Sequence, residues 1–124
     1  MNTKEVNTLV LAYLGDTVYE NYVRLYLIKI GINHVKELQE KSLEFVSAKS
    51  QSRILRELIN NNIFTSSELE VIKRGRNTKT NSHPKNTDII TYKEATSLET
   101  LIGYLKLENK EERIQEIMNN IFNH

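Results

Sequence analysis

The feature that most constrains the fold is the spacing of apolar residues, which recur every three to four positions along most of the chain. This spacing matches the 3.6-residue turn of an α-helix, and the strict alternation typical of a half-buried β-strand is absent. The sequence therefore predicts an all-α protein. A chain of 124 residues is long enough for one domain with a substantial core and too short for two. We expect a single domain over residues 1–124.

Capping residues and breaks in the apolar pattern divide the chain into six predicted helices. Gly31 follows the first helix in the position that helix C-termini prefer. Thr65 and Glu68 have the spacing of a capping box, as do Thr91 and Glu94, and each pair predicts a helix start. The expected helices cover approximately residues 5–29, 35–41, 43–60, 66–76, 92–107 and 110–122.

The segment before the fifth predicted helix is polar from Asn77 to Asp88 and contains Pro84, the only proline of the chain. Loops of this length in compact domains are usually functional or mobile. Five basic residues and no acidic residue lie between Lys73 and Lys85, while the net charge of the whole chain is only +1. We therefore expect a mobile basic loop at about 74–88. Its charge indicates either contact with a polyanion or simply a solvated loop.

Composition excludes several classes of protein. The chain has no cysteine, so it can form neither disulfides nor thiolate metal sites. No apolar run is long enough to span a membrane, and the N-terminus lacks the apolar core of a secretory signal. We expect a soluble cytoplasmic protein with no membrane association.

Two carboxylates stand out because each lies in an apolar helical segment beside a glycine. Asp16 follows Gly15 in the apolar run 11–20, and Glu99 lies four residues before Gly103. A mid-helix glycine costs about 1 kcal/mol relative to alanine, so each should allow a close approach of another backbone or a ligand. A buried carboxylate also needs a donor, a cation or a metal as partner. We expect the two helices to cross with the two semi-buried carboxylates, Asp16 and Glu99, converging.

Two carboxylates without thiolates favour an ion that prefers oxygen ligands, and Mg²⁺ is the natural candidate. The three histidines, His34, His83 and His124, are scattered over predicted loops and ends. An alternative remains open on spacing alone: Asp16 would cap a helix that begins at Thr17, and Glu99 would reach solvent.

Several motifs resemble the ribonuclease III family. The segment 14–18 (Leu-Gly-Asp-Thr-Val) is similar to the signature of that family, and the segment 98–103 (Leu-Glu-Thr-Leu-Ile-Gly) is similar to its second acidic helix. Further similar stretches, at 46–51, 73–77 and 84–88, follow in the expected order. Together they cover nearly the whole chain and resemble the mini-ribonuclease III branch, which has a catalytic domain without an appended double-stranded-RNA-binding domain.

The resemblance implies a Mg²⁺-dependent endoribonuclease that cleaves double-stranded RNA as a homodimer and leaves 5′-phosphate ends. It also implies maturation of the large-subunit (23S) ribosomal RNA precursor. Asp16 and Glu99 would be the catalytic residues and metal ligands. The residues matching RNA-binding stretches, or suited to contact phosphates, are Lys49, Ser50, Gln51, Lys73, Arg74, Arg76, Asn77, Lys79 and Lys85.

The chain departs from the larger members of the family at two positions. These members carry further acids four residues before the signature Asp and three before the helix Glu, where this chain has Ala12 and Thr96. These two differences keep open the alternative that the chain is a non-catalytic RNA-binding or ribosome-associated protein on the same fold. A helical adaptor whose basic loop binds acidic partners is a second alternative.

The homodimer is expected to use the apolar surface of the first helix. The residues expected to form this surface are Tyr13, Tyr19, Tyr22, Leu25 and Tyr26.

Overall fold

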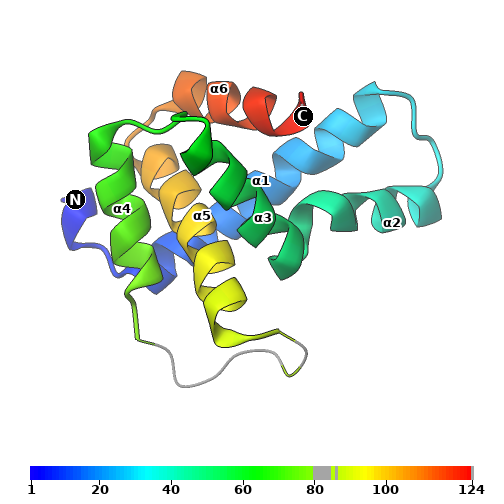
Figure 1. The fold of residues 1–124 in the computed structure, drawn as a ribbon. Helices are drawn as coiled ribbons and strands as arrows, with labels where there is room; N and C mark the ends of the chain where they lie inside the picture. Colours follow the sequence, from blue (N-terminus) through cyan, green and yellow to red (C-terminus); the bar gives the residue numbers. More distant parts are fainter. Residues whose placement is uncertain (80–84, 86, 124) are drawn as a thin grey trace.

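The computed structural model describes residues 1–79, 85 and 87–123, and within them it contains helices and no strand. A 3₁₀ turn, η1, precedes six α-helices (Figure 1). The all-α prediction is therefore confirmed. The elements are η1 (Thr3–Glu5), α1 (Thr8–Lys29), α2 (Val35–Val46), α3 (Ala48–Asn60), α4 (Ser66–Arg76), α5 (Ile89–Leu107) and α6 (Glu111–Phe122).

Helix α5 is the centre of the molecule and packs against α1, α3, α4 and α6 (Figure 1). Its contact with α1 is the most extensive between any two of the described elements. Ten residues of α5 are buried, and they include polar ones such as Glu94, Thr96 and Thr100. A helix enclosed on several sides can bury polar groups only where neighbouring elements supply partners. The partners of these polar groups define the candidate site described below.

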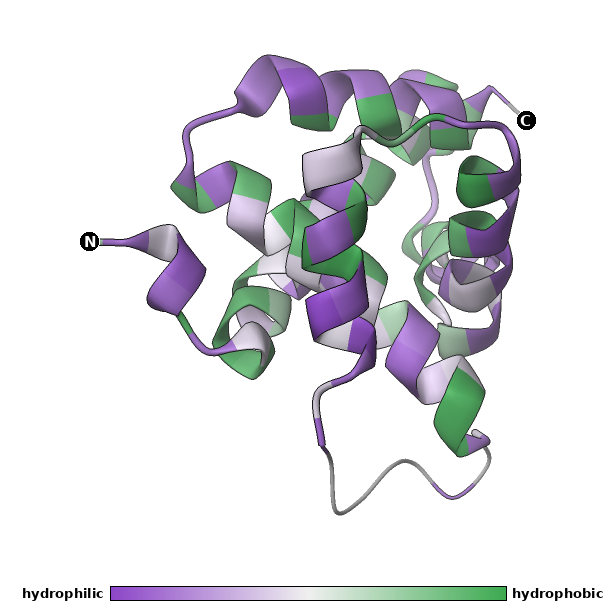
Figure 2. Ribbon diagram, turned by 60° about the vertical axis from the view of Figure 1, so that its left-hand side comes forward, coloured by the Kyte–Doolittle hydropathy of each residue, from purple (hydrophilic) through white to green (hydrophobic). Residues whose placement is uncertain are grey.

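Helices α3, α4 and α6 are amphipathic and turn their apolar residues toward this centre. Figure 2 shows this for α6, whose apolar residues face the other helices. Ile114, Ile117, Met118 and Ile121 of α6 are buried. In α3, Ile54, Leu55 and Leu58 are buried, whereas the neighbouring Ile59 is 37% exposed.

Several predicted boundaries are confirmed by the local hydrogen bonds. Gly31 ends α1 with a φ of +106°, and the N–H of Ile32 donates to the carbonyl of Leu27 at 3.2 Å, as in a Schellman motif. Thr65 and Glu68 form both hydrogen bonds of the capping box that starts α4. Turn chemistry that is local in sequence was thus sufficient to place these two helix ends.

Three predicted boundaries are wrong. The break between α2 and α3 lies at Ser47 and not at Ser42, because the Ser47 hydroxyl accepts from the N–H of Ser50 and caps α3. Helix α5 begins at Ile89 and not after Thr91, because the Asp88 carboxylate accepts from the Thr91 N–H at 2.8 Å. The first segment also divides, since η1 ends at Glu5 and α1 begins only at Thr8.

The basic segment is partly helical. Arg74 and Arg76 belong to the last turn of α4, so the loop expected at about 74–88 begins only at Asn77. Residues 80–84 and 86, with His83 among them, lie outside the described residues, as does His124.

Candidate active site

The site lies where α1 crosses α5, and two glycines bring the backbones of these helices together. A Cβ atom on Gly15 would lie 1.8 Å from the carbonyl oxygen of Glu99. A Cβ atom on Gly103 would lie 1.9 Å from the carbonyl oxygen of Leu11. Both distances are far below van der Waals contact, so no other residue fits at either position without movement of a helix. The packing reason predicted for these glycines is confirmed.

This crossing brings together the two predicted acids. Glu99 is half-buried, and its carboxyl group is hydrogen-bonded to Asp16. Burial, together with the hydrogen bond and the negative charge of Asp16, raises the pKa of Glu99 to about 8. With this pKa, Glu99 keeps its proton at neutral pH when no cation is bound beside it.

The prediction that Asp16 is semi-buried is wrong, because this residue is exposed on α1. Asp16 does not cap a helix at Thr17 either, since α1 runs without a break from Thr8 to Lys29. Glu20, one turn further along α1, forms an ion pair with Arg24 at 2.9 Å. One carboxylate of the site therefore faces solvent and the other reaches back into the protein.

A third side chain joins this pair from α3. Gln51 is only 3% exposed, and its side chain is hydrogen-bonded to Glu99. The sequence analysis considered Gln51 only as an RNA-contacting residue. The sequence nevertheless contains a signal for the burial of Gln51, because this residue lies three, four and seven positions before the buried Ile54, Leu55 and Leu58. A polar residue on a core stripe needs an internal partner.

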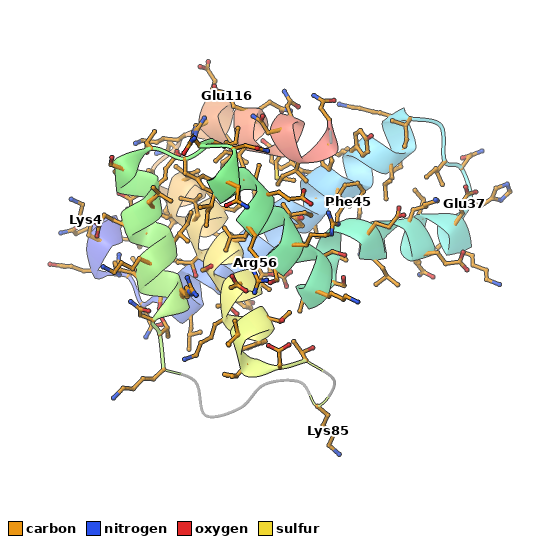
Figure 3. All side chains as sticks on the ribbon, in the orientation of Figure 1. Lys4, Glu37, Phe45, Arg56, Lys85 and Glu116 are labelled. Atoms are coloured by element: carbon orange, nitrogen blue, oxygen red, sulfur yellow. The ribbon has the colours of Figure 1, made fainter. Side chains whose placement is uncertain are left out.

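A second polar cluster lies next to the site and was not predicted. Glu94 of α5 is 5% exposed and accepts a hydrogen bond from Ser52 at 3.0 Å. Arg56, which Figure 3 labels on α3, donates to the same carboxylate through Nη2 at 2.6 Å and Nε at 3.0 Å. These hydrogen bonds from Arg56 hold the pKa of Glu94 below its usual value, and nearby Arg76 acts in the same direction. The hydrogen bonds of this cluster stabilise the packing of α3 against α5.

The donor set at the crossing fits a hard divalent cation. Asp16 and Glu99 offer carboxylate oxygens, the ligands that Mg²⁺ prefers, and a cation bound here would offset the burial and the negative charge that raise the pKa of Glu99. Within the described residues, no cluster of three or more His, Cys, Asp or Glu side chains forms a larger metal site. Ala12 and Thr96 are both buried, and the Thr96 hydroxyl donates to the carbonyl of Tyr92. Any ion held here would therefore keep several water ligands.

The basic residues lie to one side of the site. Gly75 allows the last turn of α4 to approach α5, since a Cβ on Gly75 would lie 2.8 Å from Oγ1 of Thr100. This turn carries Lys73, Arg74 and Arg76, all exposed. Of the remaining predicted RNA-contacting residues, Lys49, Asn77, Lys79 and Lys85 are exposed, Ser50 is half-buried and Gln51 is buried. The exposed Arg53 and Arg56 of α3 add basic charge that the sequence analysis did not assign to RNA.

The model of the ribonuclease III domain matches residues 9–110, which include both acids and both crossing glycines. The fold is shared with a crystal structure of a protein from Fusobacterium nucleatum. The TM-score to that structure is 0.85 and the identity 33%, over 97% of this chain and 96% of the other. The chain therefore belongs to the ribonuclease III family and is an endoribonuclease whose substrate is RNA.

Its relatives place it within one branch of the family. The chain is 42% identical to mini-ribonuclease 3 of Staphylococcus aureus, over 95% of this chain and 88% of that protein. It is 46% identical to mini-ribonuclease 3 of Clostridium tetani, over 97% and 79% of the two chains. The resemblance stated from sequence motifs is thereby confirmed. Among the described residues, no helix combines the length and hydropathy needed to cross a membrane.

Proposed function

We propose that this endoribonuclease cleaves double-stranded RNA in a Mg²⁺-dependent reaction centred on Asp16 and Glu99. The observation that carries the proposal is the hydrogen-bonded carboxylate pair at the glycine crossing of α1 and α5. When bound, Mg²⁺ would lower the pKa of a water molecule and neutralise charge on the scissile phosphate. Exposed Asp16 would face the substrate, and half-buried Glu99 would hold the ion on the side of the protein interior.

The basic and polar residues around the two acids would bind and orient the RNA. A-form duplexes are recognised mainly through phosphates and 2′-hydroxyls across a wide, shallow minor groove. The exposed basic residues of α4 and α3 lie near the acids and suit such contacts. Hydrolysis that frees the 3′-oxygen leaves a 5′-phosphate on the other product. We propose phosphate contacts by Lys49, Arg53, Lys73, Arg74, Arg76, Lys79 and Lys85, with Ser50 and Asn77 as polar contacts.

Two acids at one site cut one strand, so cleavage of a duplex needs a second site. We propose a two-fold homodimer through the outer surface of α1, where Tyr13 is 83% exposed and Val10, Leu25 and Ile28 are between 45% and 55% exposed. Tyr19 is fully buried, and Tyr22 and Tyr26 pack partly against the core, so these three contribute less to that surface than the sequence suggested. Sedimentation equilibrium of wild type and Tyr13→Glu tests the dimer. A monomeric wild type contradicts it.

The resemblance to the mini-ribonuclease branch supports a cellular role in the cytoplasm. We propose maturation of the 23S ribosomal RNA precursor at a base-paired stem. Incubation of a transcript of that stem with the protein and Mg²⁺ should give one defined cut on each strand.

The test of the proposed chemistry compares two carboxylates of α1 on a duplex RNA substrate. Asp16→Asn should lower kcat by about 100-fold or more. Glu20→Gln, which alters an exposed acid four residues away, should cleave at a rate within about two-fold of wild type. Removal of Mg²⁺ with EDTA should abolish cleavage by wild type and by Glu20→Gln. Equal cleavage by wild type and Asp16→Asn, or cleavage in EDTA, contradicts the proposal.

A further inference from the structure

Adjacent residues of α3 hold two different carboxylates of α5. Gln51 is 3% exposed and hydrogen-bonded to Glu99, and Ser52 is 5% exposed and donates to Glu94 at 3.0 Å. Both α3 side chains are polar groups inside the protein. Because each adjoins a different acid, their roles can be separated by experiment.

The contact with Glu94 has a structural explanation. Glu94 is also held by two hydrogen bonds from Arg56, so its charge is neutralised within the same pair of helices. Among the described residues no cation pairs with Glu99, whose side-chain partners are Asp16 and Gln51. An uncharged donor beside a half-buried acid does not cancel its charge. It fixes the direction of the carboxylate instead.

Burying a carboxamide is costly unless its polar atoms are bonded, and an apolar residue at position 51 would continue the stripe of Ile54, Leu55 and Leu58. Stability alone therefore does not favour glutamine at this position. Neither Ala12 nor Thr96 can replace Gln51 as a hydrogen-bond donor to Glu99. Ala12 has no polar side chain, and the Thr96 hydroxyl donates to the carbonyl of Tyr92.

We propose that Gln51 is a positioning residue of the catalytic site, which holds the Glu99 carboxylate in the orientation required for the divalent ion. In this role the carboxamide N–H donates to the Glu99 carboxylate, which together with Asp16 would hold the ion. The inference rests on the proposed function in that it takes Asp16 and Glu99 to be metal ligands. It assigns Gln51 a role in the interior and leaves contact with RNA to exposed Lys49 two residues earlier.

Metal binding in the absence of RNA tests the proposal directly. Gln51→Met keeps the length of the side chain and removes the donor, and the Kd for Mn²⁺ measured by calorimetry should rise about 10- to 100-fold. Gln51→Asn shortens the side chain, keeps the amide, and should shift the Kd in the same direction if the methionine variant folds poorly. Ser52→Ala is the matched control, because it removes the neighbouring buried donor. It should lower Tm and leave the Mn²⁺ Kd within about two-fold of wild type.

Kinetics separate positioning from RNA binding. Gln51→Met should lower kcat and raise the Mg²⁺ concentration for half-maximal rate, with KM for duplex RNA unchanged, whereas Lys49→Gln should raise KM alone. A Mn²⁺ Kd that is unchanged in both Gln51 variants, or is weakened equally by Ser52→Ala, overturns the proposal. Failure of the wild type to cleave duplex RNA contradicts only the proposed function, because the Mn²⁺ measurement decides the role of Gln51 independently.

Discussion

Gly15 and Gly103 face each other at the crossing of α1 and α5, where the amide nitrogen of Gly15 would lie 3.1 Å from a Cβ atom on Gly103. The same contact fixes the neighbours of both glycines, so Asp16 and Glu99 meet at hydrogen-bond distance. The position of the candidate active site is therefore a consequence of backbone packing. A change in this packing should affect the fold and the site together.

Gly15→Ala should destabilise the protein by about 3 kcal/mol or more, because the new methyl group overlaps the backbone of α5. Urea denaturation followed by circular dichroism measures the loss. Gly31→Ala is the control, since its Cβ would meet nothing within 4 Å, and its φ of +106° should cost only about 1–2 kcal/mol. A Gly15→Ala variant no less stable than Gly31→Ala would disprove the steric argument.

The metal-free protein should lose stability as the pH rises from about 5 to 8. The pKa of Glu99 is raised to about 8 in the folded protein, from an ordinary value of 4.5. Across this interval the folded state retains a proton that the unfolded chain has released, so folding becomes less favourable with increasing pH. Asp16→Asn removes the adjacent charge and should make this decline shallower. Tm in EDTA at pH 5 and pH 7.5 measures both effects, and parallel curves for the two proteins would contradict the prediction.

The ion pair between Glu68 of α4 and Arg113 of α6 should contribute to the free energy of unfolding at neutral pH. Arg113 binds the Glu68 carboxylate at 2.8 Å and also donates to the carbonyl of Ile63 at 2.7 Å. Glu68 is only 6% exposed, so Arg113→Met leaves a buried charge without its partner and should cost about 2–4 kcal/mol. Arg24→Met, which breaks the exposed pair with Glu20, should cost less than about 0.5 kcal/mol.

The cost of Arg113→Met should depend on pH in a defined direction. Burial tends to raise the pKa of Glu68, but the hydrogen bonds from Arg113 and the Thr65 N–H outweigh it and hold the pKa below its ordinary value. The stabilisation by the pair is therefore present above about pH 4.5 and is lost as the pH falls through the lower folded-state pKa. Urea midpoints of wild type and variant should converge between pH 5 and pH 3. A constant difference over this range would mean that Glu68 titrates normally.

Binding of duplex RNA should depend steeply on salt and should involve the last turn of α4. Each lost phosphate contact lowers the slope of log K against log salt by about 0.7–0.9. Lys73→Gln and Arg76→Gln should each show this decrease when fluorescence anisotropy is measured in an Asp16→Asn background that prevents cleavage. The exposed Lys36 of α2 provides a control, and Lys36→Gln should leave the slope unchanged. Equal slopes for all of these variants would exclude the basic turn from the RNA interface.

The sequence by itself determined the helical content and several helix ends, because these depend on interactions within a few residues. The apolar spacing predicted the all-α class, and the capping box at Thr65 and the glycine at position 31 marked helix ends that the structure confirms. Where neighbouring polar residues compete as caps, the local signal is ambiguous. The helix starts predicted near residues 43 and 92 are therefore displaced from the caps that the structure uses, Ser47 and Asp88.

Only the tertiary structure decided which groups meet at the site. The pairs Gln51–Glu99 and Arg56–Glu94 join α3 to α5 across about 40 residues of sequence, and the burial of Glu94 depends on helices whose relative placement no local pattern encodes. The exposure of Asp16 was decided in the same way. The composition of α1 indicated a carboxylate among apolar residues, but packing with α5 turned Gly15 inward and left Asp16 at the surface. The sequence thus identified both acids, and the helix crossing determined their geometry.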